Sequence, residues 1–220
     1  MVLTRSQAQS FYDRFGKKQD SQGYYEDAAL DDLIGHAAFE QAASVFELGC
    51  GTGRFACRLL NKCLPQSAAY LGVDLSRTMI DIAEQRLSVY AGRAKVAPSD
   101  GSMRFPCPDH SVDRVVATYV LDLLSEMDIR QALDESRRVL MLQGRICLVS
   151  LGGGVTFGSR IVGALWSMAF RLHAPLVGGC RPIRLESFFD QADWSVDYRH
   201  VVAPFGVPSE VLTATPKSVA

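Results

Sequence analysis

The sequence of 220 residues shows no excess of charge of either sign, because 23 Lys and Arg balance 24 Asp and Glu. Proteins that hold nucleic acid by neutralising its phosphates need a strongly positive surface, so we expect no nucleic-acid partner. No fixed-period repeat, low-complexity stretch or linker rich in Pro, Gly or Ser divides the chain. The length suits one well-buried core better than two, and we expect a single domain.

The six cysteines lack the C-x-x-C spacing of zinc sites and are few for a disulfide scaffold of this length. The adjacent acids Asp31 and Asp32 fall in an expected helix, whereas a catechol-type magnesium site needs its acids directly after a strand. The first 20 residues also lack the apolar core of a secretory signal. We therefore expect a reduced, cytoplasmic protein without a metal site.

Long hydrophobic runs are missing as well. The most apolar run, 161–170, lies between Arg160 and Arg171 and has about half of the roughly 20 residues that a spanning helix needs. We expect no transmembrane segment. The surrounding stretch, 157–184, is compatible with three roles: a buried cover helix, the wall of a pocket for an apolar molecule, or a peripheral contact with a membrane surface.

Short apolar runs alternate with amphipathic stretches along the chain. Strands are predicted at 44–48, 68–74, 94–97, 112–120 and 145–149, and an antiparallel pair at 194–202 and 210–213. The helices between them are predicted to follow Gly53, to begin at the cap Ser76, and to begin at Asp128 with Gln131 as a capping box. Strands separated by helices are typical of βαβ units, so we expect an α/β fold with a mostly parallel seven-stranded sheet and an antiparallel C-terminal strand.

Glycines and acids gather where ligands bind in such folds, at the carboxyl ends of the strands. Glu47 ends the first strand and is followed by Gly49 and Gly51, whose missing side chains let the backbone approach a ligand closely. Asp74 ends the second strand, where it is placed to accept hydrogen bonds from a ribose. Asp100 follows the third strand and is placed to accept one from an adenine amine.

The spacing of this segment admits two cofactors. The stretch 51–56 matches the G-x-G-x-x-A dinucleotide fingerprint, with Asp74 where the ribose acid belongs, so an NAD(P)-dependent Rossmann oxidoreductase is one reading. A pyrophosphate would then lie close to Glu47, which costs several kcal/mol at an effective dielectric constant of about 20. S-adenosylmethionine carries no phosphate and presents an ammonium and a sulfonium, so the acids favour it.

Four ordered segments resemble the motifs of class I S-adenosylmethionine-dependent methyltransferases, in particular the subgroup of ubiquinone and menaquinone biosynthesis (methyltransferase types 11 and 25). The resemblance covers roughly 12–150 and implies a single-domain Rossmann-like methyltransferase fold. It departs from the subgroup at Gly101, where Ala is usual, and at Val112, where Phe is usual. The segments are FELGCGTG (46–53), GVDLS (72–76), SDGSMRFP (99–106) with VDRVV (112–116), and RVL (138–140) with Gln143-Gly144.

The resemblance implies a role for each cofactor-contacting residue. Glu47 meets the methionine ammonium, while Gly49, Cys50 and Gly51 form the loop beside it. Asp74 holds the ribose hydroxyls. The remaining contacts are with adenine and the methionine arm: Leu75 packs on the adenine ring, Asp100 accepts from its amine, Gly101 or Ser102 meets a ring nitrogen through the backbone, and Tyr119 lines the methionine arm.

Methyl transfer from a sulfonium is an in-line displacement with a neutral leaving group, S-adenosylhomocysteine. The enzyme has mainly to align the groups and keep water out, and no side chain stands out as a catalytic base. We expect a small-molecule acceptor, hydrophobic and quinone- or lipid-like. Besides the oxidoreductase, a non-catalytic cofactor-binding module on the same fold is an alternative.

The expected domain, 1–220, divides into three regions. The first, 1–42, is a helical lid whose Tyr12, Tyr24 and Tyr25 are candidates for acceptor contacts. The second, 43–150, is the cofactor-binding core. The third, 151–220, holds an acceptor-side cover, with Trp166 as a further candidate contact, and the C-terminal strands.

Overall fold

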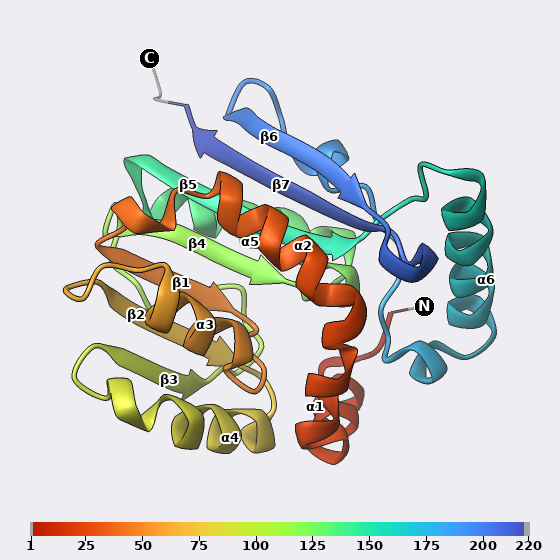
Figure 1. The fold of residues 1–220 in the computed structure, drawn as a ribbon, viewed down its shortest axis with the longest axis horizontal. Helices are drawn as coiled ribbons and strands as arrows, with labels where there is room; N and C mark the ends of the chain where they lie inside the picture. The colour runs from red at the N-terminus through yellow and green to blue at the C-terminus, as the bar shows by residue number, and fades with distance from the viewer. Residues whose placement is uncertain (1, 218–220) are drawn as a thin grey trace.

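A seven-stranded sheet with helices on both faces forms the centre of the molecule (Figure 1). The computed structural model describes residues 2–217, with the backbone alone at residues 175 and 176. The strand order is β3-β2-β1-β4-β5-β7-β6, and only β7 runs antiparallel to its neighbours. The predicted α/β class, with one antiparallel C-terminal strand, is confirmed. The strands are β1 (Ser44–Leu48), β2 (Ala69–Asp74), β3 (Ala94–Pro98), β4 (Val112–Thr118), β5 (Leu140–Leu151), β6 (Trp194–Val202) and β7 (Ser209–Pro216).

The α-helices are α1 (Arg5–Phe15), α2 (Gly23–His36), α3 (Arg54–Lys62), α4 (Arg77–Leu87), α5 (Glu126–Val139) and α6 (Phe157–His173). Short 3₁₀ segments join them: η1 (Gly16–Gln22), η2 (Phe39–Gln41), η3 (Ser88–Tyr90), η4 (Leu121–Leu123), η5 (Ala174–Val177), η6 (Leu185–Phe188) and η7 (Pro204–Gly206). Helices α2 and α3 cover one face of the sheet and α5 covers the other (Figure 1).

Two apolar cores lie on the two faces, because successive side chains of a strand point to opposite sides. Val45 joins the core beneath α2 and α3, while its neighbour Phe46 joins the core beneath α5 and packs on Phe105 with 4.7 Å between the ring centroids. Cys147 and Leu148 alternate in the same way on β5. The central strands are therefore buried on both faces, which explains their continuous apolar runs.

Helix α5 begins three residues before the predicted position. Its N-cap is Ser125, whose hydroxyl accepts a hydrogen bond from the backbone N–H of Asp128, so the predicted cap residue lies in the first turn. The Gln143-Gly144 turn is also absent: these residues lie within β5, where the pairing with β4 shifts register between Val112 and Arg114. β4 ends at Thr118, two residues early, because Tyr119 adopts a left-handed backbone with φ of 56°.

The carboxyl ends of the parallel strands face α1 and α6, which stand beyond that edge of the sheet (Figure 1). A ligand at this edge therefore lies between the ends of the strands and the N-terminal helices.

No helix within residues 2–217 is long and apolar enough to cross a membrane.

At the opposite edge, Asp113 fastens the start of β1 to the start of β4. One carboxylate oxygen accepts hydrogen bonds from the backbone N–H groups of Ala43 and Ser44, at 2.9 and 3.0 Å, and from the Ser44 hydroxyl at 3.0 Å.

We expect Asp113→Ala to lower the free energy of unfolding by about 2 kcal/mol, because charged acceptors of this kind contribute about 1.5–3 kcal/mol. Urea denaturation checks this: Asp113→Asn, which keeps one acceptor oxygen, should lose less, and an unchanged midpoint for Asp113→Ala would contradict the assignment.

Candidate functional site

The glycine loop after β1 is anchored on the end of β2. The backbone N–H groups of Gly49 and Cys50 both donate to the carbonyl oxygen of Val73, at 2.7 and 3.0 Å, and the N–H of Gly51 donates to the Asp74 carboxylate at 2.9 Å. The other carboxylate oxygen of Asp74 accepts from the N–H of Ser76 at 2.8 Å. The loop and the acid are thus one hydrogen-bonded unit.

Gly49 cannot be replaced in this loop without a clash. Its φ is 71°, and a Cβ added there would lie 2.2 Å from a methyl group of Val120. The sequence requirement for glycine therefore comes from both the left-handed backbone and the side chain that follows β4.

A mainly apolar cavity opens where β1, β2, β3 and β4 end. Six of the residues predicted to bind cofactor or acceptor line it: Gly49, Asp74, Leu75, Gly101, Tyr119 and Tyr12. Apolar side chains complete its wall, including Leu48, Val73, Met79, Met103 and Val120. We call this space the apolar cavity.

A smaller, polar cavity adjoins it and shares Gln19, Gly49, Thr118 and Tyr119 as wall residues. Glu47, Cys50 and Gly51 line this polar cavity, as the sequence predicted for one end of the site. Glu26 and Arg54 also line it, and the sequence analysis did not single them out. The predicted loop residues are therefore brought together around two adjoining spaces.

Buried carboxyl groups give the polar cavity its electrostatic character. Glu47 is 1% exposed and accepts a hydrogen bond from the Tyr70 hydroxyl at 2.6 Å. Burial raises the pKa of Glu47 to about 7, although the Tyr70 hydrogen bond opposes this shift. Burial likewise raises the pKa of Glu26 to about 7, against the opposing effect of Arg54. A cation bound between such carboxyls would stabilise their charged forms.

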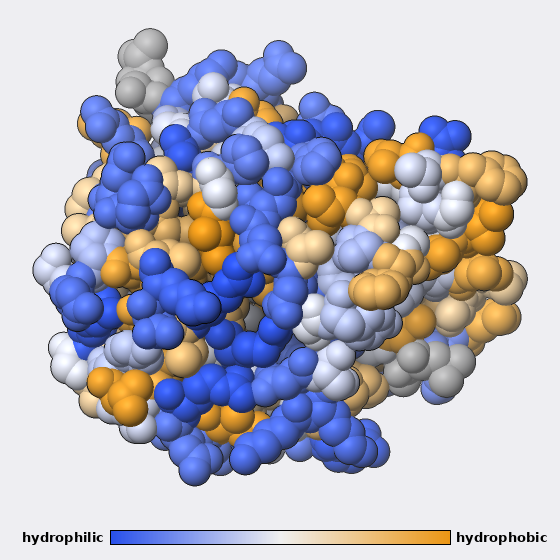
Figure 2. Space-filling model, viewed as in Figure 1, coloured by the Kyte–Doolittle hydropathy of each residue, from blue (hydrophilic) through white to orange (hydrophobic). Residues whose placement is uncertain are grey.

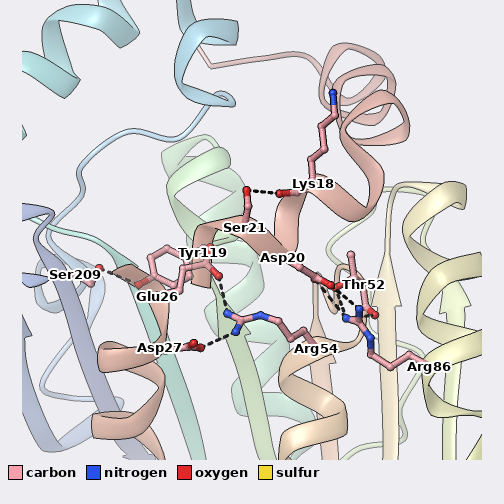
Figure 3. A network of polar contacts seen from close by, with 10 residues as sticks. All are labelled: Lys18, Asp20, Ser21, Glu26, Asp27, Thr52, Arg54, Arg86, Tyr119 and Ser209. Carbon is pink, nitrogen blue, oxygen red and sulfur yellow. Dashed lines mark hydrogen bonds and ion pairs between the residues drawn. The ribbon is translucent and has the colours of Figure 1, made fainter. Parts of the chain in front are cut away.

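Ion pairs tie the N-terminal segment over the site (Figure 3). Arg54 bridges Glu26 and Asp27 of α2, with N–O distances of 3.1 and 2.6 Å. Asp20 of η1 accepts from the Thr52 hydroxyl at 2.6 Å and from Arg86 at 2.5 Å. These contacts hold α2 and η1 against the glycine loop and the two helices that follow it.

Helix α1 is fastened to the opposite rim of the apolar cavity. Asp13 accepts from the Ser76 hydroxyl at 2.5 Å, and the Tyr12 hydroxyl donates to the carbonyl oxygen of Gly178 at 3.3 Å. A Cβ on Gly101, whose φ is 80°, would lie 2.9 Å from the Arg5 side chain. The first helix thus forms a roof that bridges β2, β3 and the η5 turn.

Comparison with known proteins agrees with this geometry. A family described as a methyltransferase domain matches residues 45–144, which hold the glycine loop, Asp74 and Tyr119. The matched region carries the motifs that resemble class I S-adenosylmethionine-dependent methyltransferases. The motif-based prediction is confirmed, and S-adenosylmethionine is the cofactor of the family.

One relative is the demethylmenaquinone methyltransferase of Thermotoga maritima, 29% identical over 181 residues that make up 80% of this chain and 74% of the relative. The matched regions of the first three curated relatives span between 51% and 74% of their lengths. Among solved structures, a chain in the complex of the Haloferax volcanii Trm112 methyltransferase activator with a methyltransferase superimposes with a TM-score of 0.75 at 14% identity, over 97% of this chain and 99% of that one. Geranyl diphosphate C-methyltransferase of Streptomyces coelicolor, solved with S-adenosyl-L-homocysteine, superimposes with a TM-score of 0.67 at 13% identity, over 86% and 79% of the two chains.

Five predicted contact residues line neither cavity: Asp100, Ser102, Tyr24, Tyr25 and Trp166. Asp100 is exposed and accepts from the N–H of Ser102 at 2.8 Å, which shapes the turn around Gly101. Tyr25 is buried with its ring edge-on to Tyr119, at 5.9 Å between centroids. The other two are Tyr24, which is 62% exposed beside Phe205, and Trp166, whose indole N–H donates to the Cys180 carbonyl at 3.0 Å.

The protein also holds a buried acid that the sequence analysis did not identify. Asp122, in η4 just beyond β4, is fully buried, and only one of its carboxylate oxygens has a hydrogen-bond partner among the described residues, the N–H of Leu151 at 3.3 Å. Burial raises the pKa of Asp122 to about 7. The sequence signal that could have found it is an acid within four residues of the end of an apolar strand, at the ligand-binding edge.

The raised pKa of Asp122 predicts how stability depends on pH. An unfolded Asp has a pKa near 3.9, so between about pH 4 and 7 the folded state holds a proton that the unfolded state has released. The free energy of unfolding should therefore fall as the pH rises through this window. Between pH 5 and 8, we expect the free energy of unfolding of Asp122→Asn to fall less than that of the wild type. Urea denaturation measures both. Asp81→Asn, at an exposed position of α4, is the control; equal slopes for the wild type and Asp122→Asn would contradict the assignment.

Proposed function

We propose that this protein transfers a methyl group from S-adenosylmethionine to a small, hydrophobic acceptor. The observation that carries the proposal is the pair of adjoining cavities around the anchored glycine loop. One is mainly apolar and touches Asp74, and the other is polar and contains the buried carboxyl of Glu47. S-adenosylmethionine divides in the same way, into a nucleoside and a cationic amino-acid arm.

The apolar cavity suits the adenosine half. Asp74 accepts hydrogen bonds from two backbone N–H groups, and each carboxylate oxygen keeps a lone pair for a ribose hydroxyl. Leu75 and Met103 provide apolar surface for the adenine ring, and the backbone at Gly101 lies beside them. The exposed side chain of Asp100 then acts by shaping this turn, with the adenine amine as its proposed partner.

The polar cavity suits the methionine arm. Glu47 provides a carboxylate for the ammonium, and the backbone of Gly49 and Gly51 lets the arm pass close to the loop. Tyr119 lies on the wall shared by both cavities, which supports a position of its ring beside the sulfur. Arg54 is paired with Glu26 and Asp27, which leaves Glu47 as the main carboxylate for the ammonium.

The cofactor supplies an activated methyl group on a sulfonium. The protein's own contribution is alignment and exclusion of water. Tyr12 and Leu3 close the apolar cavity from the side of α1, while Leu123 and Leu124 close it from η4. A hydrophobic acceptor fits this wall, and the resemblance to a demethylmenaquinone methyltransferase supports a quinone-like compound. Under this proposal, 1–42 acts as a lid over the core, 43–150.

A thermal-shift measurement separates this proposal from its main alternative. S-adenosylhomocysteine should raise the melting temperature, because it binds the folded state alone. NADH should have no such effect, because its pyrophosphate would face the carboxylates of Glu47 and Asp74. Stabilisation by NADH and not by S-adenosylhomocysteine would overturn the proposal in favour of an oxidoreductase.

We expect Asp74→Ala to weaken S-adenosylhomocysteine binding by about 2 kcal/mol, the range for hydrogen bonds to a charged group, which is roughly thirtyfold in Kd. Isothermal titration calorimetry measures the change. Asp81→Ala, an exposed acid seven residues further on α4, is the matched control and should bind like the wild type. Wild-type affinity in Asp74→Ala would show that the ribose is held elsewhere.

The pKa of Glu47 predicts the pH dependence of binding. Because the ammonium favours the ionised carboxyl, binding should tighten as the pH rises through about 7, where Glu47 loses its proton in the free protein. Glu47→Gln, which keeps the shape without the charge, should bind more weakly and with a flatter pH profile, whatever remains coming from Glu26. A wild-type profile that is flat between pH 6 and 8 would remove Glu47 from the site.

A further inference from the structure

Helix α6 presents an apolar stripe to solvent. Its members recur at positions i, i+4, i+8, i+11 and i+15, which fall within a sector of about 80° at 3.6 residues per turn. Figure 2 shows apolar surface gathered on the side of the molecule where α6 lies. The α6 stripe consists of Phe157 (82% exposed), Ile161 (46%), Leu165 (56%), Met168 (54%) and Leu172 (77%).

The opposite face of α6 holds the helix on the protein. Ser159, Gly163 and Phe170 are buried, and the Trp166 indole donates to the Cys180 carbonyl. Thr156 and Ser159 form a capping box at the first turn. The helix is thus formed and oriented with the α6 stripe outward, and the predicted role of a fully buried cover helix does not describe this face.

The charged residues of the segment that carries the α6 stripe are all basic. The segment 151–185 contains four arginines and one histidine but no Asp or Glu, in a chain with 24 acids. Arg160 and Arg171 are exposed and three helical turns apart, so they lie along the same edge of the α6 stripe. Apolar residues bordered by arginines are the pattern of helices that lie in the interface of an anionic membrane.

The same segment packs against residues that form the wall of the apolar cavity. Just after η5, the Gly178 carbonyl accepts from the Tyr12 hydroxyl, and a Cβ on Gly179 would lie 2.7 Å from a methyl group of Leu3. Tyr12 and Leu3 line the apolar cavity, as does Leu123, which also lies beside Gly179. A surface bound by α6 would therefore lie close to the cavity.

We propose that α6 lays its stripe into the surface of a bilayer containing anionic phospholipids, with Arg160 and Arg171 at the level of the headgroups. Docking in this way holds the apolar cavity at the membrane, from which a hydrophobic acceptor enters. The docking rests on the surface of α6 alone, whereas the delivery of an acceptor rests on the proposed function.

Vesicle co-sedimentation of the full chain tests the docking. The wild type should bind vesicles of phosphatidylcholine and phosphatidylglycerol in equal parts, and it should bind phosphatidylcholine vesicles at least tenfold more weakly. Leu165→Glu should weaken binding to the mixed vesicles at least tenfold. Val89→Glu, at a position of η3 that is 79% exposed, is the matched control and should bind like the wild type. Arg160→Gln with Arg171→Gln should reduce the preference for the anionic vesicles.

The outcomes that overturn the proposed docking can be distinguished from a failure of the proposed methyltransferase function. Absence of vesicle binding by the wild type, or equal binding by Leu165→Glu, overturns the docking. A wild-type dimer in analytical ultracentrifugation without lipid, which Leu165→Glu dissociates, assigns the stripe to a second copy of the chain instead. Melting temperature and S-adenosylhomocysteine affinity of Leu165→Glu should equal those of the wild type, so loss of vesicle binding with intact cofactor binding reports on α6 alone.

Discussion

Three consecutive N–H groups of the glycine loop are held by the last two residues of β2, and the geometry of the site depends on this contact. The carbonyl of Val73 accepts two of them and the carboxylate of Asp74 accepts the third. The loop can turn so tightly only because Gly49 has a left-handed backbone and no side chain to meet Val120. With the loop in this position, Glu47 points into the polar cavity and the ends of β2 and β3 remain open for a nucleoside.

The roof over this site is held more loosely than its floor. The floor consists of parallel strands buried on both faces, whereas α1 and η1 are held by contacts such as Asp20 with Arg86, whose side chains are 31% and 26% exposed. Partly exposed ion pairs contribute about 1 kcal/mol or less. Under the proposed function, a roof fastened in this way opens to admit the cofactor without disturbing the sheet, and its closure completes the exclusion of water that methyl transfer requires.

Sequence reasoning located most of the sheet and the glycine loop because both follow local rules. Apolar runs bounded by glycine or an acid marked β1, β2 and β6 to within a residue, and Ser76 capped α4 as its side chain predicts. The predicted start of α5 was wrong because Ser125 and Asp128 are both residue types that cap helices, and only the backbone conformation decides between them. Asp122, Glu26 and Arg54 were missed because their importance comes from burial beside residues distant in the chain. The direction of the α6 stripe was open for the same reason: periodicity shows which residues share a face, and not what that face meets.

The central claim is that the two adjoining cavities receive a cationic nucleoside without a diphosphate. A crystal structure of the protein with S-adenosylhomocysteine tests it most directly. The ribose hydroxyls should lie within hydrogen-bond distance of Asp74, the ammonium should face Glu47, directly or through one water, and the sulfur should lie beside Tyr119. A ligand bound outside these cavities, or one inside them with the Glu47 carboxyl turned away from it, would contradict the claim.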